Sequence, residues 1–107
     1  MIDITVDCMR YNTYCSMLRK LTKEQCVQLG DLRSKVVGKV GEAVYTGKWS
    51  VKDIRIDDFE LLQLIIVELQ MKGFKAWYVS QDEPIILKDG VVRNYYYTLE
   101  IKWELEN

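Results

Sequence analysis

An unbroken alternation of apolar and polar side chains over residues 95–105 constrains the fold of this chain more than any other feature. One phase holds only apolar residues, and the other holds Tyr96, Thr98 and the charged residues. A period of two residues is typical of a β-strand with one face on a core and the other in water. Because this pattern belongs to antiparallel sheets, we expect helices on one side of the sheet only.

Residues 57–73 predict a helix with a defined start and stop. Asp57 and Glu60 give an N-terminal capping signal, and Gly73 stands where a helix commonly ends. The helix is apolar almost all round, with a main stripe of Phe59, Leu62, Ile65, Ile66 and Leu69 and a second stripe of Leu64, Val67 and Met71. A helix that is apolar on both sides is covered on both sides. The second stripe meets either the helix predicted over residues 23–46 or a second copy of the chain, so it is a candidate oligomer interface.

An earlier helix is predicted over residues 23–46, opened by a capping box of Thr22 and Gln25. Its apolar residues recur at intervals of three and four: Cys26, Leu29, Leu32, Val36, Val37, Val40 and Val44. Gly30, Gly38 and Gly41 lie inside it, where each glycine costs up to about 1 kcal/mol relative to alanine. Either Gly38 and Gly41 admit a neighbouring backbone, or the helix bends or ends near Gly38.

Shorter patterns predict the remaining elements. Residues 2–8 alternate as a short strand, residues 10–20 fit a short helix, and residues 48–56 fit a strand broken by a bulge near Lys52-Asp53. A further strand is expected over 74–80. Residues 81–94 are expected to form a long connection with a turn at Asp89-Gly90, whose flanks 85–87 and 91–92 can extend it as a hairpin arm.

These elements predict one α+β domain spanning residues 1–107. A single core serves chains of up to roughly 200 residues, and the composition of 49% apolar and 29% charged residues is that of a globular protein. We expect a three- to four-stranded antiparallel or mixed sheet with two main helices packed on one face. No apolar run approaches the roughly 20 residues needed to cross a bilayer, and acidic residues stand where a secretory signal would be basic. We therefore expect a cytoplasmic protein.

The chain contains no histidine, and this absence disfavours most catalytic and metal sites. Histidine is the commonest general base, the usual partner of a Ser or Cys nucleophile and a frequent metal ligand. Cys8, Cys15 and Cys26 follow no CxxC pattern, and Asp57-Asp58 is better explained by helix capping than by catalysis. We therefore expect no enzyme activity, no cofactor and no metal.

Aromatic and lysine residues on the open sheet face are the candidate binding site. In one register Trp77 shares that face with Lys75 and Tyr96, and Lys102 lies on the polar side of the last strand. Such a face can stack bases or rings, or contact a protein; the other register buries Trp77 and exposes Tyr78. Lys88, beside the Asp89-Gly90 turn, is a further candidate contact. A net charge of −1 without a basic cluster disfavours nucleic acid as the partner.

Four segments, mostly in the second half of the chain, follow one another in a layout that other small proteins share. They are Gly47-Lys48-Trp49-Ser50-Val51, Leu69-Gln70-Met71-Lys72-Gly73-Phe74-Lys75, Trp77-Tyr78-Val79 and Tyr97-Thr98-Leu99-Glu100-Ile101-Lys102-Trp103. This layout resembles small uncharacterised accessory proteins encoded by tailed bacteriophages. The resemblance implies a phage origin and an accessory role in the host cytoplasm, and it transfers no functional residue. Lys75-Ala76-Trp77 and the longer loop before the last strand depart from the usual pattern.

Three functions follow as hypotheses. The first is a non-enzymatic interaction protein that binds a host or virion protein through the open sheet face or the 81–94 segment. The second is a virion or assembly component that forms a homo-oligomer through Leu64, Val67 and Met71. The third is a small-ligand or nucleic-acid binding module that uses Trp77, Tyr96 and Lys75.

Overall fold

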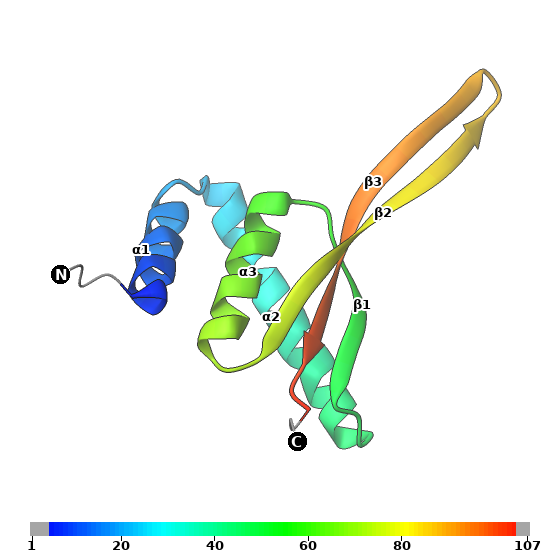
Figure 1. The fold of residues 1–107 in the computed structure, drawn as a ribbon. Helices are drawn as coiled ribbons and strands as arrows, with labels where there is room; N and C mark the ends of the chain where they lie inside the picture. Colours follow the sequence, from blue (N-terminus) through cyan, green and yellow to red (C-terminus); the bar gives the residue numbers. More distant parts are fainter. Residues whose placement is uncertain (1–4, 105–107) are drawn as a thin grey trace.

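A computed structural model describes residues 5–104 as three helices and three strands (Figure 1). In chain order they are α1 (Val6–Arg19), α2 (Lys23–Tyr45), β1 (Ser50–Ile56), α3 (Phe59–Met71), β2 (Lys75–Leu87) and β3 (Gly90–Lys102). The strands form one sheet in the order β1-β3-β2, and β3 runs antiparallel to both neighbours. The α+β class and the small antiparallel sheet are therefore confirmed.

Helix α1 replaces the strand predicted at the start of the chain. Thr5 is its N-cap, and the Cys8 amide donates to the Thr5 hydroxyl at 3.1 Å. The strand prediction is wrong for Val6–Cys8, which are helical, while residues 2–4 of that prediction lie outside the described residues. A short alternation is weak evidence, and here the cap together with the helical spacing of Tyr14, Met17, Leu18 and Leu21 decides the structure.

Helix α2 confirms its predicted span and its capping box. The Gln25 amide donates to the Thr22 hydroxyl, and the Thr22 amide donates to the Gln25 side chain, both at 3.1 Å. The helix does not end at Gly38. No neighbouring backbone uses the glycines either, because within residues 5–104 a Cβ added at Gly30, Gly38 or Gly41 meets no atom closer than 4 Å. The close-approach explanation is therefore wrong inside this chain.

The predicted apolar stripe of α2 is only partly correct. Leu29, Val36 and Ala43 are buried, and Leu32 and Val40 pack against the same core. Cys26, Val37 and Val44 are exposed, with Val37 retaining 71% of its accessible surface. The predicted set covered more than one face of the helix. The face that points at the core is the one that carries Leu29, Val36 and Ala43.

The N-cap of α3 lies one residue later than predicted. Asp58, and not Asp57, is the N-cap, with its Oδ1 accepting from the Glu60 amide at 2.9 Å and from the Leu61 amide at 3.2 Å. The helix ends at Met71, and Gly73 follows with a φ of 92°, a left-handed conformation that suits glycine. The predicted Gly73 stop is confirmed.

A bulge in β1 brings its apolar residues onto one face. The register shifts between Val51 and Ile54, where Asp53 has a φ of 66°. Val51 therefore pairs with Ile101 and Ile54 with Leu99, and all four side chains are buried. The bulge predicted near Lys52-Asp53 is confirmed. Its extra residue lets the apolar side chains before it and after it point to the same face of the sheet.

Helices α2 and α3 lie against the inner face of the sheet, the face that buries Ile54, Leu99 and Ile101 (Figure 1). Phe59 of α3 contacts the rings of Tyr78 and Tyr97 on that face, with ring centres 5.5 and 5.1 Å apart. Leu62 and Leu64 are completely buried, although they project from different sides of α3. The second side of α3 is in contact with α1, which supplies the cover that a helix apolar all round requires.

An arginine joins the three helices. Arg33 of α2 donates from Nε to Glu68 Oε1 of α3 at 2.9 Å and from Nη2 to the Tyr14 hydroxyl of α1 at 3.2 Å. Burial, followed by the negative charge of Glu68, raises the pKa of Tyr14 above its usual range. These contacts hold α1 on the body of the protein.

Strands β2 and β3 extend well beyond the helices as a two-stranded arm (Figure 1). Their pairing continues to Leu87 and Gly90, so Lys88 and Asp89 form a two-residue turn. The principal extents of 61 × 38 × 28 Å reflect this projection. Residues 81–94 thus form a paired hairpin, as predicted from their aliphatic flanks, and not an irregular connection.

Candidate binding surfaces

The arm is the most exposed part of the sheet. From Gln81 paired with Tyr96 to Leu87 paired with Gly90, it leaves the helices behind. None of the residues from 82 to 95 is buried. The arm therefore contributes no side chain to the core, and its sequence is free to serve another purpose.

Aliphatic side chains cover both faces of the arm near its tip. Ile86 pairs with Val91 and Ile85 with Val92, and because side chains alternate between faces these two pairs lie on opposite sides. All four are exposed, as is Leu87, and Ile86 retains 84% of its accessible surface. Single exposed apolar residues are ordinary, but a continuous group on a projecting element is typical of a contact surface.

Charged residues frame this apolar tip. Arg93 and Asp82 form an ion pair across the arm on the side nearer the body. Lys88, the predicted contact residue, is exposed in the turn at the far end. The apolar group therefore has a polar boundary at each end, as do many protein-binding patches.

The outer face of the sheet holds the other four predicted binding residues. Lys75 pairs with Lys102, Trp77 pairs with Glu100, and Tyr96 pairs with Gln81. Ala76 is buried and Tyr78 contacts Phe59, so the residues alternating with them lie on the outer face. The structure therefore adopts the register with Trp77 outward, at 41% exposure, and it places Lys88 apart from this group.

Both aromatic rings of the outer face make contacts within the chain. Trp77 Nε1 donates to Glu100 Oε2. The guanidinium of Arg55 lies over the Tyr96 ring, with its Cζ 4.1 Å from the ring centre, and its Nε donates to Asp57 at 3.1 Å. Sequence reasoning missed Arg55, whose position opposite Thr98 depends on the β1 bulge. The cation occupies one side of the Tyr96 ring, and this reduces the surface available for stacking a base.

The three predicted oligomer-interface residues occupy different environments. Leu64 is fully buried within the single chain, Val67 is partly buried, and Met71 is 49% exposed. Met17 of α1 and Leu21, in the connection after α1, line a hollow together with Leu64, and Val6 and Met9 of α1 line another with Val67. Met71 is therefore the member of this set with most surface left for a partner.

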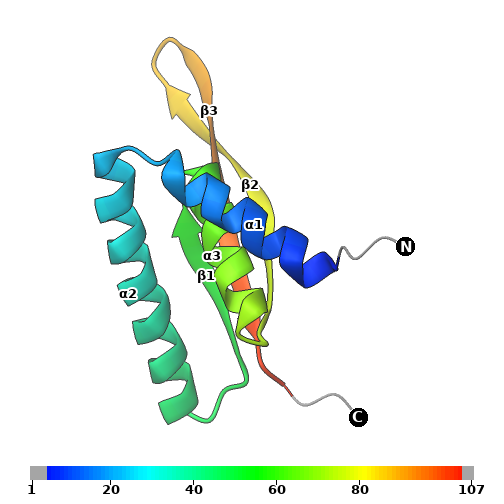
Figure 2. The same ribbon diagram turned by 90° about the vertical axis from the view of Figure 1, so that its left-hand side faces the viewer.

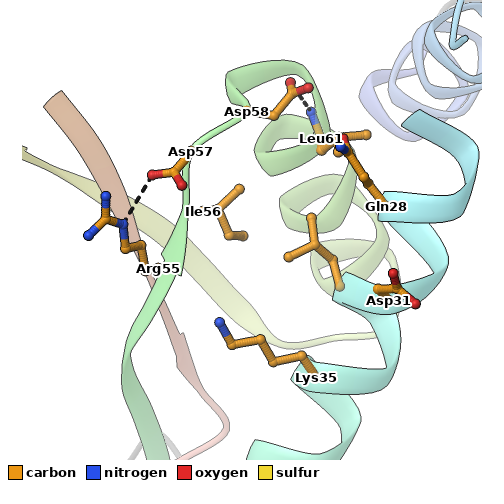
Figure 3. Close-up of a pocket in the computed structure, with 9 residues that line it drawn as sticks. Gln28, Asp31, Lys35, Arg55, Ile56, Asp57, Asp58 and Leu61 are labelled. Carbon is orange, nitrogen blue, oxygen red and sulfur yellow. Dashed lines mark hydrogen bonds and ion pairs between the residues drawn. The ribbon is translucent and has the colours of Figure 1, made fainter. Parts of the chain in front are cut away.

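A cleft of about 630 Å³ separates α2 from the junction of β1 and α3 (Figure 3). Leu32, Ile56 and Leu61 form its apolar lining, and the polar residues at its sides are Gln28, Asp31, Lys35, Arg55, Asp57 and Asp58. Asp57 is paired with Arg55, while Asp58 caps α3 and accepts from Gln25 Nε2 at 3.2 Å. Both carboxylates of the acidic pair thus have structural partners.

The nine residues that line the cleft include no Ser, Cys or His, and both carboxylates of the acidic pair have structural partners. A nucleophile needs an adjacent base, and a general base needs a free position facing the substrate. Within residues 5–104 no group of three His, Cys, Asp or Glu side chains is arranged to hold a metal ion. Over the same residues, no helix is both long and apolar enough to cross a membrane.

No family model, curated protein or solved structure matches this chain. The exposed surfaces described above are therefore the features from which a function can be inferred.

Proposed function

We propose that this chain is a non-enzymatic binding protein whose arm, residues 81–94, engages a partner protein. The observation that carries the proposal is the exposed aliphatic tip, formed by Ile85, Ile86, Leu87, Val91 and Val92. A two-stranded hairpin is at best marginally stable in water, and an apolar one gains most from being covered.

The form of the arm indicates how it binds. Its strands have open edges beyond the end of β1, so main-chain N–H and C=O groups can pair with a strand of the partner. The aliphatic side chains then fill apolar pockets on either side of that strand. Binding by main-chain pairing with side-chain anchors requires no catalytic group and no cofactor.

The phage resemblance extends this proposal to a biological setting. An accessory protein of a tailed phage would act in the host cytoplasm, and its partner would be a host or virion protein. The absence of histidine and the capping role of Asp58 support a binding function over an enzymatic one. The outer sheet face is second to the arm, because Arg55 and Glu100 already contact its rings.

A single substitution at the tip tests the proposal. Ile86→Asp places a charge where an apolar anchor is expected, and loss of a buried Ile side chain corresponds to about 1.5–3 kcal/mol, or about 10- to 100-fold in affinity. Immobilised wild-type and variant proteins are incubated with a lysate of the cells in which the chain is naturally made. Mass spectrometry then quantifies each retained protein.

Tyr11→Asp is the matched control, because Tyr11 is an exposed apolar residue on α1, away from the arm. We expect at least one protein to be retained by the wild type and by Tyr11→Asp and to be depleted at least about 10-fold by Ile86→Asp. Identical sets of retained proteins for all three would refute arm binding.

A further inference from the structure

One exposed face of α2 carries a heptad-spaced row of uncharged residues. The row, called here the α2 seam, consists of Val27, Gly30, Ser34, Val37, Gly41 and Val44. Residues spaced alternately by three and four lie in one row along the side of a helix, as the contact positions of a coiled coil do. All six residues are exposed, and Figure 2 shows α2 along an outer edge of the molecule.

None of the six seam residues is charged, although Lys23 continues their line one turn before Val27. Asp31 and Lys35 line the cleft beside β1 and α3, and Lys39 and Glu42 line the hollow beside the first half of β1. Arg33 is bound to Glu68. The solvent-facing part of an ordinary surface helix is charged or polar. Here the charges lie on either side of the seam, and none of its six residues is charged.

The two glycines of the seam face open space in the part of the chain that the structure describes. Glycine disfavours a helix, and a helix interior accepts it where another backbone approaches closely. Within residues 5–104 no atom lies within 4 Å of a Cβ added at Gly30 or Gly41. Their small size leaves room for a helix from outside the described residues to approach closely.

The order of residues in the seam identifies that neighbour. Read from either end, the seam begins with valine followed by glycine. An antiparallel copy of α2 would place Val27 opposite Val44, Gly30 opposite Gly41 and Ser34 opposite Val37. A two-fold axis requires such self-complementarity, and no like charges meet because the seam carries none.

We infer that the α2 seam joins two copies of this chain as an antiparallel helix pair. The 23 residues of α2 make a helix about 34 Å long at 1.5 Å per residue. One helix face of that length is a small interface, so the dimer is reversible, with a Kd of roughly micromolar order. The seam lies on α2 and the arm on β2 and β3, so this interface is independent of arm binding.

The molecular mass in solution tests the interface. Sedimentation equilibrium from about 1 to about 300 µM should show wild-type monomers passing into dimers. Val37→Glu, at the centre of the seam, should raise the Kd by about 100-fold or more, because a charge would be buried without a partner. Lys39→Glu, which introduces the same side chain two residues away, beside the seam, should leave the Kd within about 3-fold.

Engineered cysteines test the antiparallel order. The native Cys8, Cys15 and Cys26 are first replaced by serine. A disulfide needs Cα atoms within about 7 Å, and residues 27 and 44 of one helix are about 25 Å apart. Oxidised Val27→Cys/Val44→Cys protein should therefore become a covalent dimer, as should an equal mixture of the two single variants. Either single variant alone should stay monomeric under non-reducing conditions.

Three results would each overturn the inference. One is a wild-type chain that stays monomeric at about 300 µM. Another is a dimer that persists in Val37→Glu. Loss of that dimer in Met71→Glu would then place the interface on α3 instead of on α2. The third is cross-linking of a single-cysteine variant with itself, which indicates a parallel pair. Far-UV circular dichroism of each variant confirms that the helices are retained.

Discussion

The environment of single side chains in α3 explains why its sequence is apolar on every side. Leu62 and Leu64 are both completely buried although they project from different sides of the helix. The two stripes could be read from the sequence, because helical spacing alone defines them. The cover of Leu64 could not, because the pattern of residues 10–20 indicates a short helix but not the element against which that helix packs.

Leu64 and Met71 should therefore differ greatly in their contribution to stability, although sequence reasoning grouped them. Leu64→Ala removes a fully enclosed side chain and should lower the free energy of unfolding by about 2–5 kcal/mol. Met71→Ala, at an exposed position near the end of α3, should cost less than about 1 kcal/mol. Urea unfolding at low protein concentration measures both. Equal effects would mean that α1 does not cover Leu64.

Tyr14 should make the chain less stable at high pH. Burial, and then the negative charge of Glu68, raises its pKa above the ordinary value of 10.0. The folded chain thus holds the phenol proton more tightly than the unfolded chain. The resulting stabilisation is complete below pH 10 and is lost as the pH rises through the folded-state pKa.

The Tyr14→Phe variant has no such proton, so its unfolding free energy should fall less steeply than that of the wild type between about pH 9.5 and about pH 11. Urea unfolding of both proteins at matched pH values gives the comparison. Parallel pH dependences would contradict the role assigned to Tyr14.

At the scale of elements, local chemical signals predicted boundaries better than they predicted faces. The Thr22–Gln25 capping box, the Gly73 stop and the β1 bulge all have short-range causes, and the structure contains each of them. Which residues of α2 point at the core depends on the sheet and on α3, which are distant in sequence. The predicted stripe consequently mixed buried Leu29 and Val36 with exposed Val37 and Val44.

Two glycines should respond in opposite directions to the same substitution. Gly38 is in the exposed middle of α2, beside the seam and with no atom near an added Cβ, so Gly38→Ala should raise the unfolding free energy by about 0.5–1 kcal/mol. Gly73 has a φ of 92°, so Gly73→Ala should lower it by about 1–2 kcal/mol. Thermal or urea unfolding at low protein concentration tests both. A loss of stability in Gly38→Ala would mean that α2 is constrained at that point.

At the scale of the whole molecule, the fold consists of a body that contains the core and an arm that projects from it. The body buries the inner face of the sheet under α2 and α3, while none of the residues from 82 to 95 is buried. The turn signal at Asp89-Gly90 and its aliphatic flanks indicated a hairpin arm. Its projection past the helices could not be predicted, because it depends on β1 ending at Ile56 and on the helices covering only the proximal part of the sheet.

Two arms on one dimer would bind a multivalent partner more tightly than one arm does. A second contact becomes intramolecular once the first has formed, and its effective concentration then replaces the bulk concentration. The α2 seam and the arm thus have a combined consequence, although each is tested by its own substitutions.

The unfolding free energy of a shortened chain tests the division between body and arm most directly. Residues 82–95 are replaced by Asn-Gly, which joins Gln81 to Tyr96 through a tight hairpin turn. Because none of the removed residues belongs to the buried core, the shortened chain should unfold cooperatively with a free energy within about 1 kcal/mol of the wild type. A loss of more than about 3 kcal/mol, or failure to fold, would show that the arm supports the body and would contradict its assignment as an element kept for a partner.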